Sequence, residues 1–335
     1  MKGICLSSRI KSLLVVACLL AAMMVYSCDY IPADKPGSIG GAHEISEIDM
    51  PDTLPPLAAA PVVIPNIPVP VASGIAVAEN AKAIIDFSNI RDGYIMAAFH
   101  EDDSNQIRLV IVKPGGVSYT FRLNPGEGFH VFPLSLGDGE YNVGIWEQVD
   151  GDMYRRVLAE SFYVQLSDEF APFLRPNELV DFDQDSLVVI TAAEQTAGLE
   201  SQIDKIDAIY YYLIDNMIYD DDLAEAVQTD LTYIPDITAV LERGMGICFD
   251  FAAVMTAMLR SQGIPTKMVV GQRGDEPHAW VSVYTEESGM VNDLFFFEGG
   301  IWVNIDPTAA ASGNERPEVN EFIGDWADYH AHFFY

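Results

Sequence analysis

Gly244-Met245-Gly246-Ile247-Cys248-Phe249-Asp250-Phe251-Ala252-Ala253 marks a change from loop to helix. The two glycines permit a tight loop in which bulkier residues would be strained. After the loop, residues on one helical face recur at three- and four-residue steps: Cys248, Phe251, Ala252, Met255 and Leu259. We therefore expect Cys248 in the first turn of a buried helix, where free N–H groups and the helix dipole favour an anion. Such a setting lowers the pKa of a thiol.

Two later segments carry groups that would complete a nucleophilic site. His278 begins His278-Ala279-Trp280-Val281, and Asp306 lies in Asn304-Ile305-Asp306-Pro307-Thr308. A thiol, an imidazole and a carboxylate are the parts of a nucleophile, its base and the group that orients the base. Taken singly, each has an ordinary interpretation, because a cysteine is usually a small buried hydrophobe and an aspartate before proline a turn former. Together they predict an acyl-transfer site.

Length, charge and cysteine content limit the class of protein. The chain has 335 residues, enough for two domains and additional segments. Its formal net charge of −32 repels phosphate backbones, so we expect no nucleic-acid partner, and solubility is the interpretation we favour for the charge. The cysteines are Cys5, Cys18, Cys28 and Cys248, a distribution that indicates no disulfide framework. Cys248 is the single cysteine after residue 28, which favours a reactive thiol.

Residues 1–28 have the pattern of an export signal. A basic start without acidic residues precedes an apolar run from Leu13 to Tyr26, which is short for a bilayer-spanning helix. Val25-Tyr26-Ser27-Cys28 resembles the cleavage site of bacterial lipoproteins, which implies a lipid on Cys28. We therefore predict an exported protein anchored through Cys28 at the cell surface. Ordinary cleavage with secretion, or an uncleaved anchor, is the alternative.

Residues 29–80 are predicted to be a linker. Prolines recur among small and β-branched residues, a composition typical of an extended, semi-rigid spacer. The apolar segment Val62-Val63-Ile64 could instead dock on the following domain.

Residues 81–168 are predicted to form an antiparallel β-sandwich. Segments rich in branched and aromatic residues are Ala83–Phe87, Tyr94–Phe99, Ile107–Val112, Val117–Leu123, His130–Leu134, Tyr141–Trp146 and Arg156–Val164. Turn pairs such as Asp92-Gly93 and Pro125-Gly126 separate them, as in a sandwich. No catalytic constellation is found here, and His100 and His130 are interpreted as surface or strand residues. The domain is therefore expected to be a spacer or recognition module.

Residues 169–335 change in character. A stripe at helical spacing predicts a long amphipathic helix: Leu199, Ile203, Ile206, Tyr210, Leu213 and Met217. Asp220-Asp221-Asp222 should end it; calcium binding is conceivable, but a solvated loop is the favoured interpretation. The helix at Cys248 should end near Gly263, and Thr266–Gln272, His278–Thr285 and Ile301–Ile305 read as strands. A helix followed by strands predicts an α+β domain.

Four segments of this second domain, in order and at suitable spacing, resemble the transglutaminase-like superfamily with its papain-like fold. They are Gly246–Ala252, Leu259–Lys267, His278–Val281 and Asp306–Thr308, within a resemblance that covers roughly residues 194–314. The predicted fold class is therefore α+β, with a β-sandwich domain followed by a papain-like, transglutaminase-like domain.

The resemblance assigns roles residue by residue. It implies Cys248 as nucleophile, His278 as base and Asp306 as the residue that orients His278. The backbone N–H of Cys248 should supply one oxyanion donor, and Tyr233 is the candidate for the second. No cofactor and no metal are expected, and the substrate would be a protein or peptide.

The triad does not itself select the acyl acceptor. Water gives a protease or amidase, whereas a substrate lysine gives a protein crosslink. The absence of a recognisable calcium loop and the abundance of water slightly favour hydrolysis. The alternatives are transglutaminase-type crosslinking and an inactive surface module used for binding or adhesion.

Overall fold

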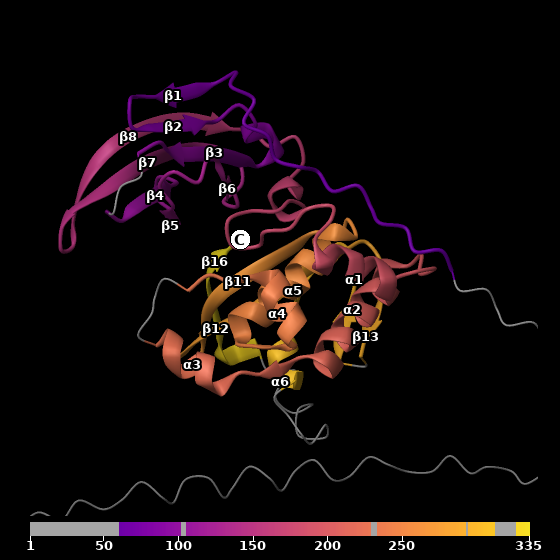
Figure 1. Ribbon diagram of the computed structural model, residues 1–335. Coiled ribbons are helices and arrows are strands. Elements are labelled where there is room, and N and C mark those ends of the chain that lie inside the picture. The colour runs from indigo at the N-terminus through magenta and orange to yellow at the C-terminus, as the bar shows by residue number, and fades with distance from the viewer. Residues whose placement is uncertain (1–59, 102–104, 229–232, 293, 312–325) are drawn as a thin grey trace, which may run out of the picture. The chain divides into compact units, whose positions relative to one another are not determined.

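The computed structural model describes residues 60–101, 105–228, 233–292, 294–311 and 326–335 (Figure 1). The predicted export signal, the lipidation at Cys28 and most of the predicted linker lie outside these residues. All of these described residues belong to one compact unit. In the described part of the chain, no helix has the length and apolar character needed to cross a membrane.

The first half of this unit contains two four-stranded antiparallel sheets. One has the strand order β1-β2-β3-β6, formed by Val77–Glu79, Ala83–Asp86, Tyr94–Phe99 and His130–Pro133. The other has the order β5-β4-β7-β8, formed by Ser118–Leu123, Ile107–Val112, Gly139–Asp150 and Met153–Val164. Ile85 and Ile95 from the first sheet and Leu109 and Ile145 from the second are buried in the hydrophobic core. The predicted strand-rich, antiparallel region is confirmed.

Two strands are longer than the sequence indicated. β7 and β8 pair from Gly139↔Val164 to Asp150↔Met153, beyond the apolar segments that predicted them. Their outer residues mix polar and apolar side chains, with Glu147 buried and Val149 and Met153 exposed, so they show no hydrophobic alternation that would predict a strand.

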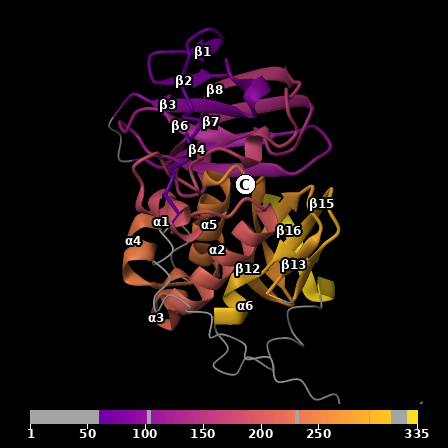
Figure 2. The same ribbon diagram turned by 90° about the vertical axis from the view of Figure 1, so that its right-hand side faces the viewer.

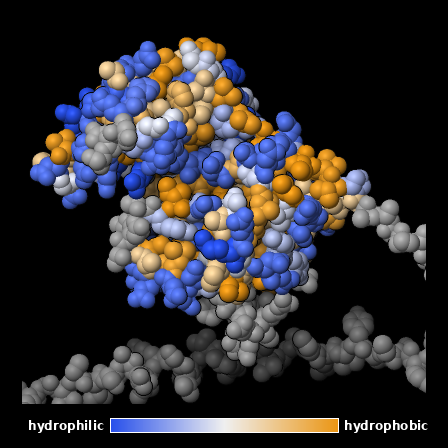
Figure 3. Space-filling model, viewed as in Figure 1, coloured by the Kyte–Doolittle hydropathy of each residue, from blue (hydrophilic) through white to orange (hydrophobic). Residues whose placement is uncertain are grey.

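The end of the predicted linker is part of the folded unit. β1 lies inside the range 29–80 and pairs with β2. Ile67 is buried, its N–H donates to Oε1 of Gln184 at 3.0 Å, and Nε2 of Gln184 donates to the carbonyl of Pro65 at 2.7 Å. Val62, Val63 and Ile64, the residues considered for docking, are exposed. Hydrophobic colour accordingly follows the extended segment on the right of Figure 3.

The second half combines helices with a four-stranded sheet. The helices are α1 (Leu187–Gln195), α2 (Gln202–Asn216), α3 (Asp221–Val227), α4 (Ile237–Arg243), α5 (Cys248–Ser261) and α6 (Pro307–Ala311). The sheet order is β15-β12-β11-β16, formed by Ile301–Ile305, Glu276–Thr285, Thr266–Arg273 and Tyr329–Phe334, all antiparallel. Two small sheets add β9 (Ile218–Tyr219) with β10 (Met245–Gly246), and β13 (Gly289–Val291) with β14 (Phe295–Phe297). The α+β prediction is confirmed.

Two details differ from the sequence interpretation. Asp220 does not end the long helix as part of a solvated loop; it is the N-cap of α3, with Oδ1 accepting the Leu223 N–H at 2.9 Å. The sequence does not reveal this cap, because any one of the three consecutive carboxylates could be the capping residue. Helix α1 was not predicted, since its residues are apolar on most sides and show little periodicity.

Helix α5 is the centre of the second half. From Asp250 to Ser261 every residue is buried. The helix packs on β11 and β12 on one side and on α1, α2 and α4 on the other. Figure 2 shows α5 between α1 and α4 on one side and β12, β15 and β16 on the other. An almost wholly buried helix gives its first residue, Cys248, a fixed position.

Candidate active site

The loop before α5 is shaped by its glycines. Gly244 has φ 63°, in the left-handed region, and its N–H donates to the carbonyl of Val240, which ends α4. A Cβ at Gly246 would lie 2.6 Å from the Cβ of Asp250, closer than side chains pack. The first glycine therefore allows the turn, and the second allows Asp250 to fold back over the loop.

Asp250 caps the start of α5 from inside. The carboxylate accepts the Ile247 N–H on Oδ2 at 2.8 Å and the Tyr233 O–H on Oδ1 at 2.6 Å. Burial raises the pKa of Asp250, and the hydrogen bonds from Tyr233 and Ile247 oppose that rise. The capping role fits the helix-start position of the residue.

The hydroxyl of Tyr233 is therefore already used in a hydrogen bond to Asp250 in this structure. A phenol has one hydrogen, and the Tyr233 hydroxyl gives it to the carboxylate. The role of Tyr233 as second oxyanion donor stays a prediction, and this arrangement does not favour it.

Cys248 is the first residue of α5, is half-buried, and is a free cysteine in the part of the chain that the structure describes. The first-turn N–H groups of a helix have no intrahelical acceptor, so they face outward beside the thiol. The Cys248 side chain lies close enough to the ring of His278 to raise the pKa of that imidazole.

His278 connects the thiol to a carboxylate. It lies on β12, opposite Gly271 of β11, and its Nε2 is 2.7 Å from Oδ2 of Asp306. This leaves Nδ1 for the thiol. Burial lowers the pKa of His278, but the hydrogen bonds and charges of Asp306 and Cys248 outweigh burial and raise it to about 9. The imidazole is therefore held as a cation over the neutral pH range.

Asp306 is fully buried and has its two oxygens occupied. Oδ1 accepts the N–H groups of Thr308 at 3.0 Å and Ala309 at 3.2 Å, which caps α6. Oδ2 accepts from His278 and from the Tyr329 hydroxyl, each at 2.7 Å. Burial raises the pKa of Asp306, but these donors outweigh it and leave the pKa below its ordinary value. The carboxylate is therefore ionised and rigidly oriented.

Tyr329 is a site residue that the sequence analysis missed. It begins β16, and besides its hydrogen bond to Asp306 its ring packs edge-on against His278 and Trp280, at centroid distances of 5.8 and 5.2 Å. The alternation in Tyr329-His330-Ala331-His332 was the available signal for a strand, but nothing in sequence links that strand to Asp306.

Trp280 packs beside the site. Its ring stacks near His278 at 6.1 Å, and its Nε1 is buried without a hydrogen-bond partner among the described residues. The structure thus brings Cys248, His278 and Asp306 together in one series, with a hydrogen bond between His278 and Asp306. Such a series can take a proton from a thiol, hold it on an imidazole, and return it to a leaving group.

Comparison with known proteins places this series in a family context. Residues 190–307 match the sequence profile of the Transglutaminase-like superfamily, so the resemblance is confirmed for this part of the chain. The uncharacterized protein YebA of Bacillus subtilis (strain 168) is 27% identical over 136 residues, which are 35% of this chain and 17% of YebA. The chain thus spans far less than two thirds of that relative.

Two crystal structures are similar at a distance. A "Putative Cysteine Protease" from Cytophaga hutchinsonii has a TM-score of 0.33 and 16% identity, covering 62% of this chain and 67% of that one. Red sea bream transglutaminase has a TM-score of 0.27 and 14% identity, covering 66% of this chain and 48% of that one. Similarity at this level says nothing about the reaction.

Proposed function

We propose that this protein is a thiol acyl-transfer enzyme that acts on amide bonds of proteins or peptides. The observation that carries the proposal is the position of His278, which lies beside Cys248 and hydrogen-bonds the buried Asp306. The match of residues 190–307 to the Transglutaminase-like superfamily supports it.

Each residue has a definite task in the proposed reaction. In the resting site the proton of Cys248 is already on the ring of His278, so a thiolate lies beside an imidazolium, and this thiolate attacks the amide carbonyl. His278 then protonates the departing amine as the tetrahedral adduct collapses to a thioester. Asp306 fixes the ring and stabilises the imidazolium, while the Cys248 backbone N–H receives the oxyanion.

Water is the proposed acceptor in the second half of the reaction. His278 removes a proton from the water, the hydroxyl attacks the thioester, and the Cys248 thiolate leaves. The same steps with a lysine amine would give a crosslink instead. Hydrolysis is slightly favoured because water is the default acceptor unless a site excludes it.

The proposed location is the outer face of the cell. Cys28 would carry the lipid, and residues 29–59 would separate it from the folded unit at 60–335. Radiolabelled palmitate incorporated into the wild-type chain but not into Cys28→Ala would support this location. Equal labelling of both would contradict it.

One experiment tests the activity and its acceptor together. A mixed peptide library is incubated with the protein in ¹⁸O-water containing dansylcadaverine, and the products are analysed by mass spectrometry. New carboxyl groups that carry ¹⁸O indicate hydrolysis, and dansyl adducts indicate transamidation. If Cys248→Ala yields the same products as the wild type, or neither yields any, the proposed function is wrong.

A further inference from the structure

A cleft adjoins the start of α5 and is lined by residues from both halves of the folded unit. Its volume is about 370 Å³. The second half contributes Tyr233 and Phe249, and Phe249 directly follows the proposed nucleophile Cys248. The first half contributes residues of two neighbouring strands, β4 and β5, among them Arg108 and Arg122. A molecule held in this cleft would therefore lie beside the first turn of α5.

The two arginines lie directly opposite each other. Arg108 pairs with Arg122 in the antiparallel ladder of β4 and β5, and both residues are exposed. Like charges at directly opposed positions destabilise a sheet, because their Cβ atoms are only about 4.5–5.5 Å apart. This pair of cations therefore costs stability unless an anion neutralises it.

Neither arginine has an acidic partner in the described part of the chain. The side chain of Arg122 has no ion pair, hydrogen bond or ring contact there. The guanidinium of Arg108 lies 4.1 Å from the centre of the Tyr154 ring, whose hydroxyl donates to Oε1 of Gln106 at 3.1 Å. Tyr154 therefore holds Arg108 without neutralising it. In a chain with 50 acidic and 18 basic residues, two adjacent cations without a carboxylate partner are unexpected.

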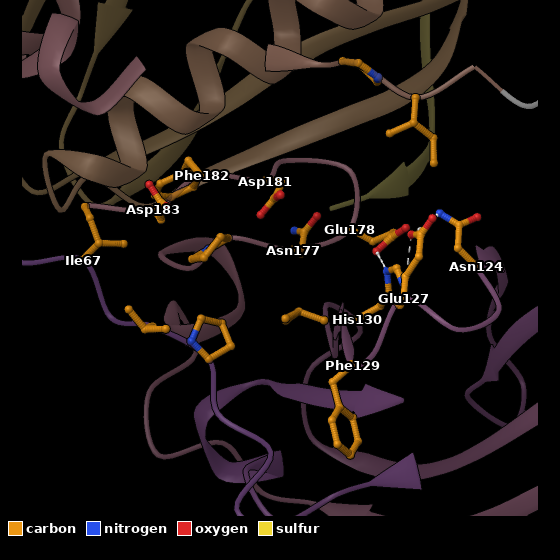
Figure 4. Close-up of a pocket in the computed structure, with 16 residues that line it drawn as sticks. Ile67, Asn124, Glu127, Phe129, His130, Asn177, Glu178, Asp181, Phe182 and Asp183 are labelled. Atoms are coloured by element: carbon orange, nitrogen blue, oxygen red, sulfur yellow. Dashed lines mark hydrogen bonds and ion pairs between the residues drawn. The ribbon is translucent and has the colours of Figure 1, made fainter. Parts of the chain in front are cut away.

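The carboxylate side chain found among the described residues of the cleft has a partner of its own. Oε2 of Glu178 lies 2.7 Å from Nδ1 of His130, as the dashed line between them shows (Figure 4). This hydrogen bond raises the pKa of His130 against the opposing effect of burial. The other charged side chains that line the cleft are the two arginines. The cleft therefore presents positive charge to a ligand.

The charge and the place of the cleft together indicate which substrates it would favour. Arginine binds carboxylates through two parallel N–H···O bonds, and a carboxylate is the anion that peptide side chains carry. We infer that the cleft selects peptide substrates with an aspartate or glutamate side chain, which Arg122 and Arg108 bind while the peptide continues to Cys248. This inference rests on the proposed function, because it names the substrates of that same site.

Peptide binding to the full chain tests the inference separately from catalysis. The probes are amidated, dansyl-labelled peptide libraries that lack Asp and Glu, except that each position in turn is fixed as Glu, Gln or Lys. Fluorescence anisotropy measures their binding to the Cys248→Ala variant, and mass spectrometry measures the products formed by the wild type. We expect Glu at one position or more to tighten binding about tenfold relative to Gln, the effect of one charge-assisted pair.

Two further substitutions in the Cys248→Ala background assign the preference to the cleft. Arg122→Glu should remove the preference for Glu and favour Lys at the same position. Arg156→Glu is the matched control, because Arg156 is an exposed arginine on β8 of the same sheet and does not line the cleft. It changes the net charge equally and should leave the preference unchanged. Circular dichroism should show every variant folded.

Three binding results would overturn the inference. They are equal binding of the Glu and Gln libraries, a preference for Glu that survives Arg122→Glu, and a preference that Arg156→Glu also removes, which would indicate net charge alone. Products that form at the same rate from all libraries would refute the inference and leave the proposed function standing. Binding that depends on Glu and Arg122, without products from any library, would support the cleft and contradict the proposed function.

Discussion

Replacing Asp306 with asparagine removes the group that keeps His278 protonated. The substitution is nearly isosteric, and Oδ1 can still accept the N–H groups of Thr308 and Ala309 that begin α6. On the other side, however, an amide N–H₂ group would face the Nε2–H of His278 and the O–H of Tyr329, which are both donors. We therefore expect a folded protein in which the imidazole of His278 is no longer held in its present orientation.

The size of the effect follows from the pKa of His278. Asp306 and Cys248 raise it from the ordinary 6.5 to about 9 against the opposing effect of burial. That rise corresponds to about 3 kcal/mol of preference for the imidazolium. Without the carboxylate, burial is opposed by Cys248 alone, and we expect the pKa of His278 to fall well below 9.

Side-chain ¹H–¹⁵N NMR of the histidines measures this change directly. His278 is assigned by the signal lost in His278→Gln, and its titration is followed in the wild type, in Asp306→Asn and in Asp328→Asn. Asp328 is an exposed carboxylate on the short helix Trp326–Asp328, so its substitution is the control and should not move the pKa. A His278 that still titrates near 9 in Asp306→Asn would refute the proposed electrostatic coupling.

Further predictions concern the groups around the series. Because the pKa of His278 is higher in the folded state than in the unfolded state, protonation of His278 stabilises the fold fully below pH 6.5, and this stabilisation is lost as the pH rises through 9. Urea unfolding should show that up to about 3 kcal/mol of the unfolding free energy is lost over this range, and His278→Gln should abolish that dependence on pH. Tyr329→Phe removes one hydrogen bond to a buried carboxylate and should lower the unfolding free energy by about 1.5–3 kcal/mol, whereas Tyr163→Phe on the exposed face of β8 should not. Gly246→Ala forces a Cβ against Asp250 and should lower the melting temperature through a cost of about 1–3 kcal/mol. The guanidinium of Arg260 donates hydrogen bonds to three backbone carbonyls. Arg260→Met leaves these carbonyls without their donors and should lower the unfolding free energy by several kcal/mol in the same assay.

Local patterns predicted much of this arrangement. The glycine pair, the stripe after Cys248 and the order of His278 and Asp306 were enough to indicate a thiol, an imidazole and a carboxylate on a helix start and adjacent strands. The structure places them on α5, on β12 and immediately before α6. Each of these patterns lies within a short segment of the sequence, so it can be recognised without knowledge of the tertiary fold.

The missed features depend on contacts between distant segments. Tyr329 reaches Asp306 only because β16 pairs with β11, and no periodicity reveals that pairing. The segment that contains Glu178 likewise lies against β6, where the Glu178 N–H donates to the carbonyl of Val131, and no local pattern indicates this contact. Tyr233 was proposed for its position in the sequence, whereas in the structure its hydroxyl is held by Asp250.

Alkylation of Cys248 by iodoacetamide across the pH range tests the central claim most directly. Wild type and His278→Ala are labelled in parallel, and modification of Cys248 is followed by peptide mass spectrometry. A paired thiolate should react well below pH 7, where an ordinary thiol of pKa about 8.5 is almost fully protonated, and the substitution should remove this reactivity. Slow labelling that follows an ordinary thiol titration, and is the same in His278→Ala, would contradict the account.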